Sequence, residues 1–183
     1  MIVELRQYTL HPGRRDELIE LFEREFIAPQ EAAGIAIDGT FRDADRPDMF
    51  VWLRSFPDME SRRRSLEEFY GGPVWRAHRD AANATMIDSD NVLLLRGERP
   101  PRFTDVVQAR VYVFPDAAAL AAYAGEANIP VWITEPSPNT FPRLPVRGES
   151  HAMLVFGVPR DERYLSQIMN LVPTQGTVSK SSK

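Results

Sequence analysis

The sequence contains no cysteine, which excludes disulfide bonds, thiol catalysis and zinc sites built on thiolates. It also lacks any apolar run near the ~20 residues that a helix needs to cross a bilayer. The N-terminal stretch carries Glu4 and Arg6 where a signal peptide would have its apolar core. We therefore expect a cytoplasmic protein that does not associate with membranes.

Several common motifs are missing as well. The GxGxxG and P-loop patterns of nucleotide binding, the HExxH zinc motif and the GxSxG motif of serine hydrolases do not occur. The 22 basic and 26 acidic side chains give a net charge of −4, which argues against a dedicated nucleic-acid-binding protein. The composition, 43% hydrophobic and 26% charged, is that of an ordinary globular protein with a buried core. We expect no metal, nucleotide or other cofactor.

The first part of the chain has the pattern of a ferredoxin-like unit. Residues 2–10 alternate as a strand does, and Pro12-Gly13 then leads into an amphipathic helix. The predicted elements are a strand at 2–10, a helix from Arg14 to the Pro29–Gly34 region, strands at 35–42 and 49–56, a helix at 59–69, a helical run at 74–86 and a strand at 91–96. This is the order β-α-β-β-α-β.

The second part repeats the opening strand, since Arg110 and Tyr112 in QARVYVFP correspond to Arg6 and Tyr8. We expect strands at 105–114, 129–134, 151–158 and 168–172, a helix at 116–127, and a last helix trimmed to a short turn. The predicted domains are a first ferredoxin-like half at 1–97, a linker at 98–104, a second half at 105–175 and a disordered tail at 176–183.

The fold class follows from this arrangement. Each half would form a four-stranded antiparallel sheet with helices on one face, and the other face, being apolar, has to be covered. The simplest cover is the sheet of the other half. The sequence therefore predicts an α+β fold of tandem ferredoxin-like halves that pack their sheets into a barrel-like body, and we expect this body to self-associate as a homo-oligomer.

Four phrases occur together in a fixed order: ELRQYTLHPG at Glu4–Gly13, FVWLRSFPDMESR at Phe50–Arg62, FYGGPVWRAHRDAANATMIDSDNVLLL at Phe69–Leu95, and EPSPNTFPRLPVR at Glu135–Arg147. Together they resemble the NIPSNAP family of the dimeric α/β-barrel superfamily. The resemblance implies the fold and says little about activity. Relatives in the superfamily include cofactor-independent monooxygenases, haem-dependent peroxidases and dehydratases, and polyketide cyclases.

Arg62 is a candidate inward-facing cation. At about 100° per residue, it falls within the apolar arc that Met59, Leu66 and Tyr70 form on their helix. A buried guanidinium needs a carboxylate, a cluster of carbonyls or an anionic ligand. Glu4 is a suitable partner if it faces the same layer, so a structural ion pair is the first interpretation and a ligand site the second.

Two neighbouring strands carry further candidates. Arg6 and Tyr8 share a face of the first strand, and Trp52 and Arg54 share a face of the strand at 49–56. These two strands are neighbours in a ferredoxin-like sheet, so the four side chains converge if the faces agree. The group suits an anionic or carbonyl-bearing aromatic compound. A buried polar network between sheet and helix fits equally well.

Trp75, His78, Ala82 and Met86 have the spacing of one helical stripe. His78 could act as a general base or as an axial haem ligand, although a lone helical histidine is more often a hydrogen-bonded packing residue. The proline-rich segment 135–147 could be a lid over a pocket, or a crossover that fixes the two sheets together, which we favour slightly.

Three hypotheses about function follow, and the first two are of different classes. The first is an enzyme of the dimeric α/β-barrel type, monooxygenase-like or cyclase/isomerase-like, for a small and partly aromatic carbonyl or carboxylate compound. The second is a non-catalytic ligand-binding or scaffold protein, and a haem-binding variant is the third. In the enzyme, oxygens would be held by Arg6, Arg54 and Arg62, walls formed by Trp52, Tyr70 and Trp75, and a proton transferred by Tyr8 or His78.

Overall fold

The computed structural model describes residues 1–157 and 161–175. Its strands form one closed barrel in the order β1-β3-β2-β8-β5-β7-β6-β4, and every neighbouring pair is antiparallel. The strands are β1 (Ile2–Leu10), β2 (Ala36–Asp43), β3 (Met49–Phe56), β4 (Met86–Arg96), β5 (Val107–Val113), β6 (Val131–Thr134), β7 (Ala152–Phe156) and β8 (Leu165–Pro173). The predicted tail at 176–183 lies outside the described residues. The turn expected after Pro159 lies partly outside them.

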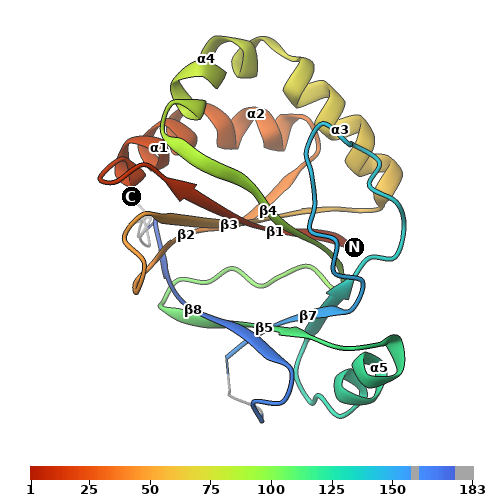
Figure 1. Ribbon diagram of the computed structural model, residues 1–183. Helices are drawn as coiled ribbons and strands as arrows, with labels where there is room; N and C mark the ends of the chain where they lie inside the picture. The colour runs from red at the N-terminus through yellow and green to blue at the C-terminus, as the bar shows by residue number, and fades with distance from the viewer. Residues whose placement is uncertain (158–160, 176–183) are drawn as a thin grey trace, which may run out of the picture.

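The helices lie on the outside of the barrel. They are α1 (Arg15–Leu21), the π-helix η1 (Phe22–Phe26), α2 (Ile27–Ala32), α3 (Met59–Gly71), α4 (Pro73–Asn83) and α5 (Ala117–Gly125). Figure 1 shows α1 to α4 in a layer over β1–β4, while α5 alone covers strands on the opposite side. Within the described part of the chain, no helix is long and apolar enough to cross a bilayer.

Strands from both parts of the chain share the barrel interior. Val3 and Leu5 of β1 point inward together with Val111 of β5 and Leu154 of β7, all of them fully buried. The other face of β1 packs under the helices, as the alternation of the sequence predicts. An α+β fold with a shared, barrel-like core is thereby confirmed.

The two predicted four-stranded sheets are joined to each other by hydrogen bonds between their edge strands. β2 pairs with β8 at Phe41↔Pro173 and the two following positions, and β4 pairs with β6 at Leu95↔Thr134 and Arg96↔Ile133. These two short seams join the strands into a closed barrel, which leaves no sheet edge at either junction.

The end of the second helical run also differs from the prediction. α4 ends at Asn83 instead of reaching Met86, and the Thr85 hydroxyl donates a hydrogen bond to the carbonyl of Ala82. β4 then begins at Met86, five residues before the predicted strand. The exposed, polar run that starts β4 reads as a loop in the sequence, and it becomes a strand because β1 supplies its hydrogen-bond partners.

A substitution in the barrel interior should therefore destabilise the whole chain. We expect Leu154→Ala to lower the free energy of unfolding by about 2–5 kcal/mol, because it leaves a cavity in the shared core. Urea unfolding should stay a single transition by circular dichroism and by tryptophan fluorescence. Ile87→Ala, at a side chain that is 60% exposed, is the control and should change little. Two separate transitions would contradict a common core.

Candidate functional site

The site is built on the helix-facing side of β1. Glu4, Arg6 and Tyr8 point toward the helical layer, and the antiparallel register sets Glu4 opposite Arg54 and Arg6 opposite Trp52. Directly opposed residues place their side chains on the same face of a sheet. The predicted convergence of Arg6, Tyr8, Trp52 and Arg54 is therefore what the register produces.

Glu4 is the centre of a buried ion-pair network. Its Oε2 accepts hydrogen bonds from Arg6 Nη1 and from Arg54 Nε, both at 2.7 Å. Its Oε1 accepts from Arg62 Nε, also at 2.7 Å. All four side chains are at most 1% exposed, so Glu4 is the partner of Arg62 that the sequence suggested.

Three guanidinium groups thus share a single carboxylate. Among the described residues no second carboxylate bonds to them, so the cluster carries two positive charges in excess. Burial raises the pKa of Glu4, but the three guanidinium groups outweigh it and hold this pKa well below its usual range. The further acceptors are neutral: the Gln30 amide and Tyr70 hydroxyl for Arg54, and the Asn139 amide and Thr140 hydroxyl for Arg62.

Aromatic faces disperse part of the excess charge. The Trp52 ring lies 5.5 Å from the Arg6 guanidinium carbon and 4.9 Å from that of Arg54. Phe56 and Tyr70 contact Arg54 in the same way. Cation–π contacts of this kind are worth about 2 kcal/mol when desolvated, which is well short of an ion pair in the interior.

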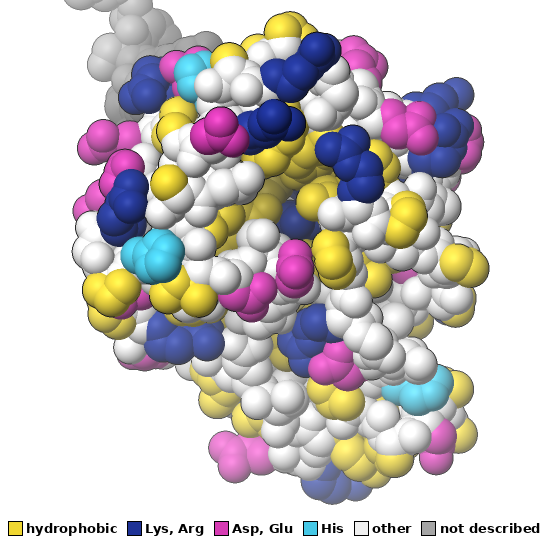
Figure 2. All heavy atoms as spheres, turned by 45° about the horizontal axis from the view of Figure 1, so that its top comes forward, with side chains coloured by type: hydrophobic (Ala, Val, Ile, Leu, Met, Phe, Trp, Pro, Cys, Tyr) yellow, Lys and Arg dark blue, Asp and Glu magenta, His cyan; other side chains and the backbone are white. Residues whose placement is uncertain are grey.

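A cavity of ≈ 320 Å³ opens directly above Arg6. Arg6, Tyr8 and Tyr70 form its buried floor, and apolar and polar side chains together form its sides. Its walls and rim are formed by Trp75, Arg79, Asn83, Met86, Ser89, Asp90, Phe141, Arg143 and Leu144. Figure 2 shows a hollow in the helical face, with hydrophobic side chains in its walls and basic side chains at its bottom and edge. The volume lies within the range of small-molecule sites, roughly 300–1,000 Å³.

Two bulges in β4 shape one side of this cavity. Asn91 pairs with Gln7 and Asp88 pairs with Thr9, so Ser89 and Asp90 together lie opposite Tyr8. A second shift follows before Met86, which pairs with Leu10. Bulges re-aim side chains in this way and are common beside active sites.

The proline-rich segment 135–147 forms the opposite side. Phe141 stacks on Tyr70 with ring centroids 5.9 Å apart and an interplanar angle of 29°. Asn139 Oδ1 accepts a hydrogen bond from Arg62 Nη1 at 3.0 Å. Figure 1 shows the segment between β6 and β7 rising to α3. It crosses between the two parts of the chain and is also a wall of the cavity.

The two floor tyrosines are placed as hydrogen-bond donors to a ligand. The Tyr8 hydroxyl accepts from Arg6 Nε at 3.1 Å, and the Tyr70 hydroxyl accepts from Arg54 Nη1 at 3.3 Å. Burial raises the pKa of Tyr8 although Arg6 opposes it, so the phenol keeps its proton. Since the hydroxyl oxygen is engaged as an acceptor, the O–H proton is free for an acceptor in the cavity.

Apart from His78, the predicted site residues divide into two groups. Arg6, Tyr8, Tyr70 and Trp75 line the cavity. Trp52, Arg54 and Arg62 lie behind the floor, where they hold Glu4 or Arg6 in place. Only Arg6 among the three arginines reaches the cavity, and its Nη2 has no protein acceptor within the described residues.

His78 lies outside the cavity lining, which agrees with the packing role that the sequence favoured over a general base or a haem ligand. Its Nε2 is 3.4 Å from Glu25 Oε2, and its ring packs against Phe26. The cavity-facing stripe of α4 is Trp75, Arg79 and Asn83, one position further round the helix than the spacing suggested. These contacts fit a packing role for His78. Its position does not fit that of an axial haem ligand in this cavity.

The sequence reasoning missed the rim of the cavity. Arg79 could have been found from its i+4 spacing to Trp75. Asp90 and Arg143 gave no local signal, because their positions depend on a bulge and on a long-range crossover. In residues 1–157 and 161–175, no group of three or more His, Asp or Glu side chains could hold a metal ion.

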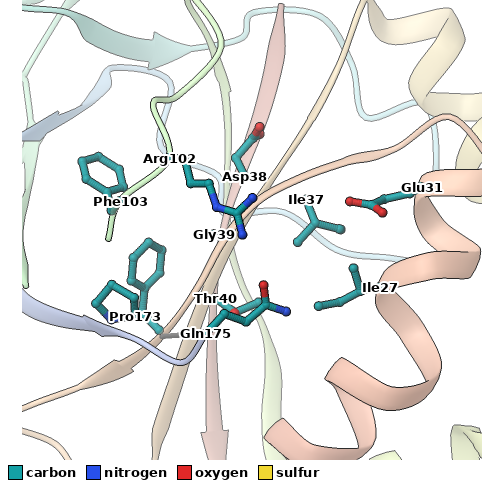
Figure 3. A pocket seen from close by; sticks show the side chains of 11 residues that line it. Ile27, Glu31, Ile37, Asp38, Gly39, Thr40, Arg102, Phe103, Pro173 and Gln175 are labelled. Atoms are coloured by element: carbon teal, nitrogen blue, oxygen red, sulfur yellow. The ribbon is translucent and has the colours of Figure 1, made fainter. Parts of the chain in front are cut away.

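A second hollow, near β2 and the end of β8, measures only ≈ 80 Å³. Figure 3 shows Arg102 and Gln175 reaching into it, with Ile27 and Glu31 projecting from α2. An engineered cavity of about 150 Å³ binds benzene, and a space of about half that size is too small for an aromatic ligand. A third, of ≈ 340 Å³ beside β4 and β6, contains the internally paired Arg147 and Glu149.

Comparison with known proteins places the chain in a family. The NIPSNAP family model matches residues 3–96, which is just over half of the chain. The chain belongs to the NIPSNAP family. The matched residues include β1, β3, α3 and α4, so they carry most of the cavity of this NIPSNAP protein. The comparison with curated proteins finds no match.

Solved structures resemble the NIPSNAP chain to different extents. A NIPSNAP-like domain protein from Burkholderia xenovorans is 28% identical over 56% of this chain and 93% of its own, with a TM-score of 0.49. A protein from Fusobacterium nucleatum, provisionally named a monooxygenase, is 7% identical over 95% and 92%, with a TM-score of 0.61. One from Lactobacillus acidophilus with the same provisional name is 12% identical over 94% and 93%, with a TM-score of 0.58. At such identities the last two show the fold alone.

Removal of the shared carboxylate should be costly. We expect Glu4→Gln to lower the free energy of unfolding by about 3–5 kcal/mol at neutral pH, because three buried guanidinium groups lose their counter-charge. Urea denaturation measures this loss. Glu60→Gln, at an exposed ion pair on α3, is the matched control and should have little effect. A loss as small as that of the control would contradict the central role of Glu4.

The same carboxylate predicts a pH dependence. Because the pKa of Glu4 is lowered in the folded state, its stabilising contribution is present above its ordinary value near 4.5 and is lost as the pH falls toward the folded-state pKa. Below that ordinary value the unfolded chain binds a proton that the folded chain does not. The stability difference between the wild type and Glu4→Gln should therefore shrink on acidification. Denaturation midpoints of both proteins across this window measure it, and a constant difference would contradict the assignment.

Proposed function

We propose that the cavity binds a small, partly aromatic compound through a carboxylate or carbonyl oxygen, and that the protein acts on it without metal or nucleotide. The observation that carries this proposal is the excess of two buried positive charges immediately beneath a cavity with aromatic and aliphatic side chains in its walls. An uncompensated buried charge is expensive. An anionic oxygen on the floor would offset part of that cost.

Arg6 and Tyr8 supply the contacts for this oxygen. Arg6 offers its Nη2, which lacks a protein acceptor among the described residues, and Tyr8 offers its O–H proton. Both are held from behind, Arg6 by Glu4 and Trp52, and Tyr8 by Arg6. Preorganised donors in a site of low polarity stabilise an oxyanion or enolate as it forms.

Tyr8 is the proton-transferring residue in this proposal. A phenol with a raised pKa is a weak acid, so it suits a substrate oxygen that becomes strongly basic when a neighbouring carbon loses its proton to a water molecule in the cavity. Monooxygenation, with dioxygen as the oxidant of the activated substrate, and a cyclisation or isomerisation both pass through such an oxyanion. The fold similarity to two proteins provisionally named monooxygenases supports the first by analogy.

A ligand-binding protein without turnover is the second candidate. Among the described lining residues the only carboxylate is that of Asp90. Asp90 is exposed at the rim, so it lacks the buried surroundings of a typical general base. His78, the other candidate for proton transfer, lies outside the lining. This observation favours binding alone, and the proton-transfer role of Tyr8 is what separates the two functions.

We also propose that the chain consists of two tandem ferredoxin-like halves. In support, the strands of each part follow the same sequential order in the barrel, with β4-β1-β3-β2 answered by β8-β5-β7-β6. The cytoplasmic location and the self-association stay predictions.

A test of the binding role replaces Arg6. Arg6→Met removes one of the two excess charges while Arg54 and Arg62 still neutralise Glu4, so the free energy of unfolding should stay the same or rise by about 1–2 kcal/mol. The rise in denaturation midpoint that benzoate produces in the wild type should disappear. Arg64→Met, an exposed site outside the lining, should keep that rise. Breaking a buried ion pair typically costs about 3–5 kcal/mol. If Arg6→Met lowers the free energy of unfolding by about 3 kcal/mol or more, Arg6 serves to stabilise the fold and not to bind a ligand.

A test of the catalytic role replaces Tyr8. Tyr8→Phe should weaken benzoate binding about tenfold or more, because a hydrogen bond to a charged group is worth about 1.5–3 kcal/mol. Isothermal titration calorimetry measures this. Tyr112→Phe is the matched control on β5, where the hydroxyl is fully buried and has no hydrogen-bond partner among the described residues. If a substrate is turned over, Tyr8→Phe should abolish turnover, and unchanged turnover would leave the binding-only function.

A further inference from the structure

The mouth of the cavity carries two cations in addition to Arg6 on the floor. Arg79 on α4 and Arg143 in the segment 135–147 line the same cavity as Arg6, but both are exposed, whereas Arg6 is 1% exposed on the floor. The cavity therefore has guanidinium groups at both its closed and its open end.

Neither mouth arginine has a close acidic partner. Arg79 Nε is 3.7 Å from Asp80 Oδ1, and Asp80 is 96% exposed. Arg143 contacts the ring of Phe141 at 5.6 Å, and no ion pair of the described residues includes it. By contrast, Arg14 and Arg63 each hold a carboxylate at 2.6 Å. The two guanidinium groups at the mouth are therefore available to a ligand.

Apolar side chains line part of the wall between these two ends, together with the polar Asn83 and Ser89. Trp75, Met86, Phe141 and Leu144 separate the floor from the mouth. Asp90 lies on the β4 side of the rim and offsets one of the two cations there, so the rim keeps one positive charge in excess. The local charge is positive at both ends although the whole chain has a net charge of −4.

Building on the proposed function, we infer that the ligand is a dianion with its two anionic groups at opposite ends of an aromatic or apolar body. One group lies on the floor against Arg6 and Tyr8, and the other lies at the mouth between Arg79 and Arg143. The floor fixes the ligand by buried hydrogen bonds, and the mouth selects for the second charge. The shared chemistry at the mouth is an anionic oxygen, as in a carboxylate or a sulfonate.

The size of the preference follows from exposure. Ion pairs at an exposed rim are each weak and are screened by salt. Together the two arginines should favour a dianion over the matching monoanion by about three- to tenfold at low ionic strength. This preference should decrease as salt is added, whereas binding at the buried floor should depend much less on salt.

Calorimetric titration with three probes tests the inference. Benzoate carries one anionic group, terephthalate adds a second carboxylate on the far side of the ring, and 4-sulfobenzoate adds a sulfonate at the same place. The wild type should bind terephthalate about three- to tenfold more tightly than benzoate at low salt. Comparison with 4-sulfobenzoate shows whether the mouth prefers a carboxylate or accepts either oxyanion.

The double variant Arg79→Gln/Arg143→Gln should lose the preference and bind terephthalate and benzoate about equally. The matched control is Arg64→Gln/Arg96→Gln, which removes two exposed charges outside the lining and should keep the preference. Equal binding of both probes by the wild type, or a preference that survives in the mouth variant, would overturn the second anionic group and leave the proposed function intact. Failure of benzoate and of both dianions to bind would overturn both.

Discussion

The structure depends on one carboxylate that three arginines share. Glu4 connects β1 to β3 through Arg54 and to α3 through Arg62, and it holds Arg6 at the floor of the cavity. Through the other donors of Arg54 and Arg62, the same network reaches α2 at Gln30 and the segment 135–147 at Asn139. A single acidic side chain thus sets the relative positions of sheet, helices and crossover. Its cost is a buried charge imbalance, and that imbalance lies where a ligand would be most strongly attracted.

The cavity is assembled from both parts of the chain. Its floor belongs to β1 and α3, but the wall with Phe141 comes from the segment between β6 and β7. The corresponding place on β5 has an arginine and a tyrosine as well, yet there Tyr112 is packed against Phe114 and Tyr123 with its hydroxyl buried. The single helix α5 covers that side with apolar side chains. The chemistry therefore concentrates under the helices α1 to α4.

Much of the site could be predicted because it depends on local periodicity. The two-residue repeat of β1 sets Glu4, Arg6 and Tyr8 on one face, and the helical repeat of α3 places Arg62 among apolar neighbours. The partnership of Glu4 with Arg62 followed from those two patterns and from the cost of burying an unpaired charge. The family resemblance supplied the fold, which the closed barrel confirms in its coarse form.

The remainder depended on interactions that a local pattern does not encode. The turn of α4 differs by one position from the expected stripe, which moves His78 out of the cavity and brings Arg79 to it. The residues before Asn91 look like a loop, since their strand character comes only from pairing with β1. The place of Phe141 beside Tyr70 results from a contact across 71 positions of the chain, for which no short-range signal exists.

The bulges of β4 make this edge of the cavity sensitive to length. Two extra residues on β4, relative to β1, set Ser89 and Asp90 opposite Tyr8 and bring Met86 level with Leu10. Because side chains alternate between the two faces of a strand, loss of one residue there would turn its neighbours from the cavity toward the barrel interior. Exchange of side chains at these positions alters the lining but leaves the frame in place. Insertions and deletions, more than substitutions, are thus the changes that would redraw this part of the molecule.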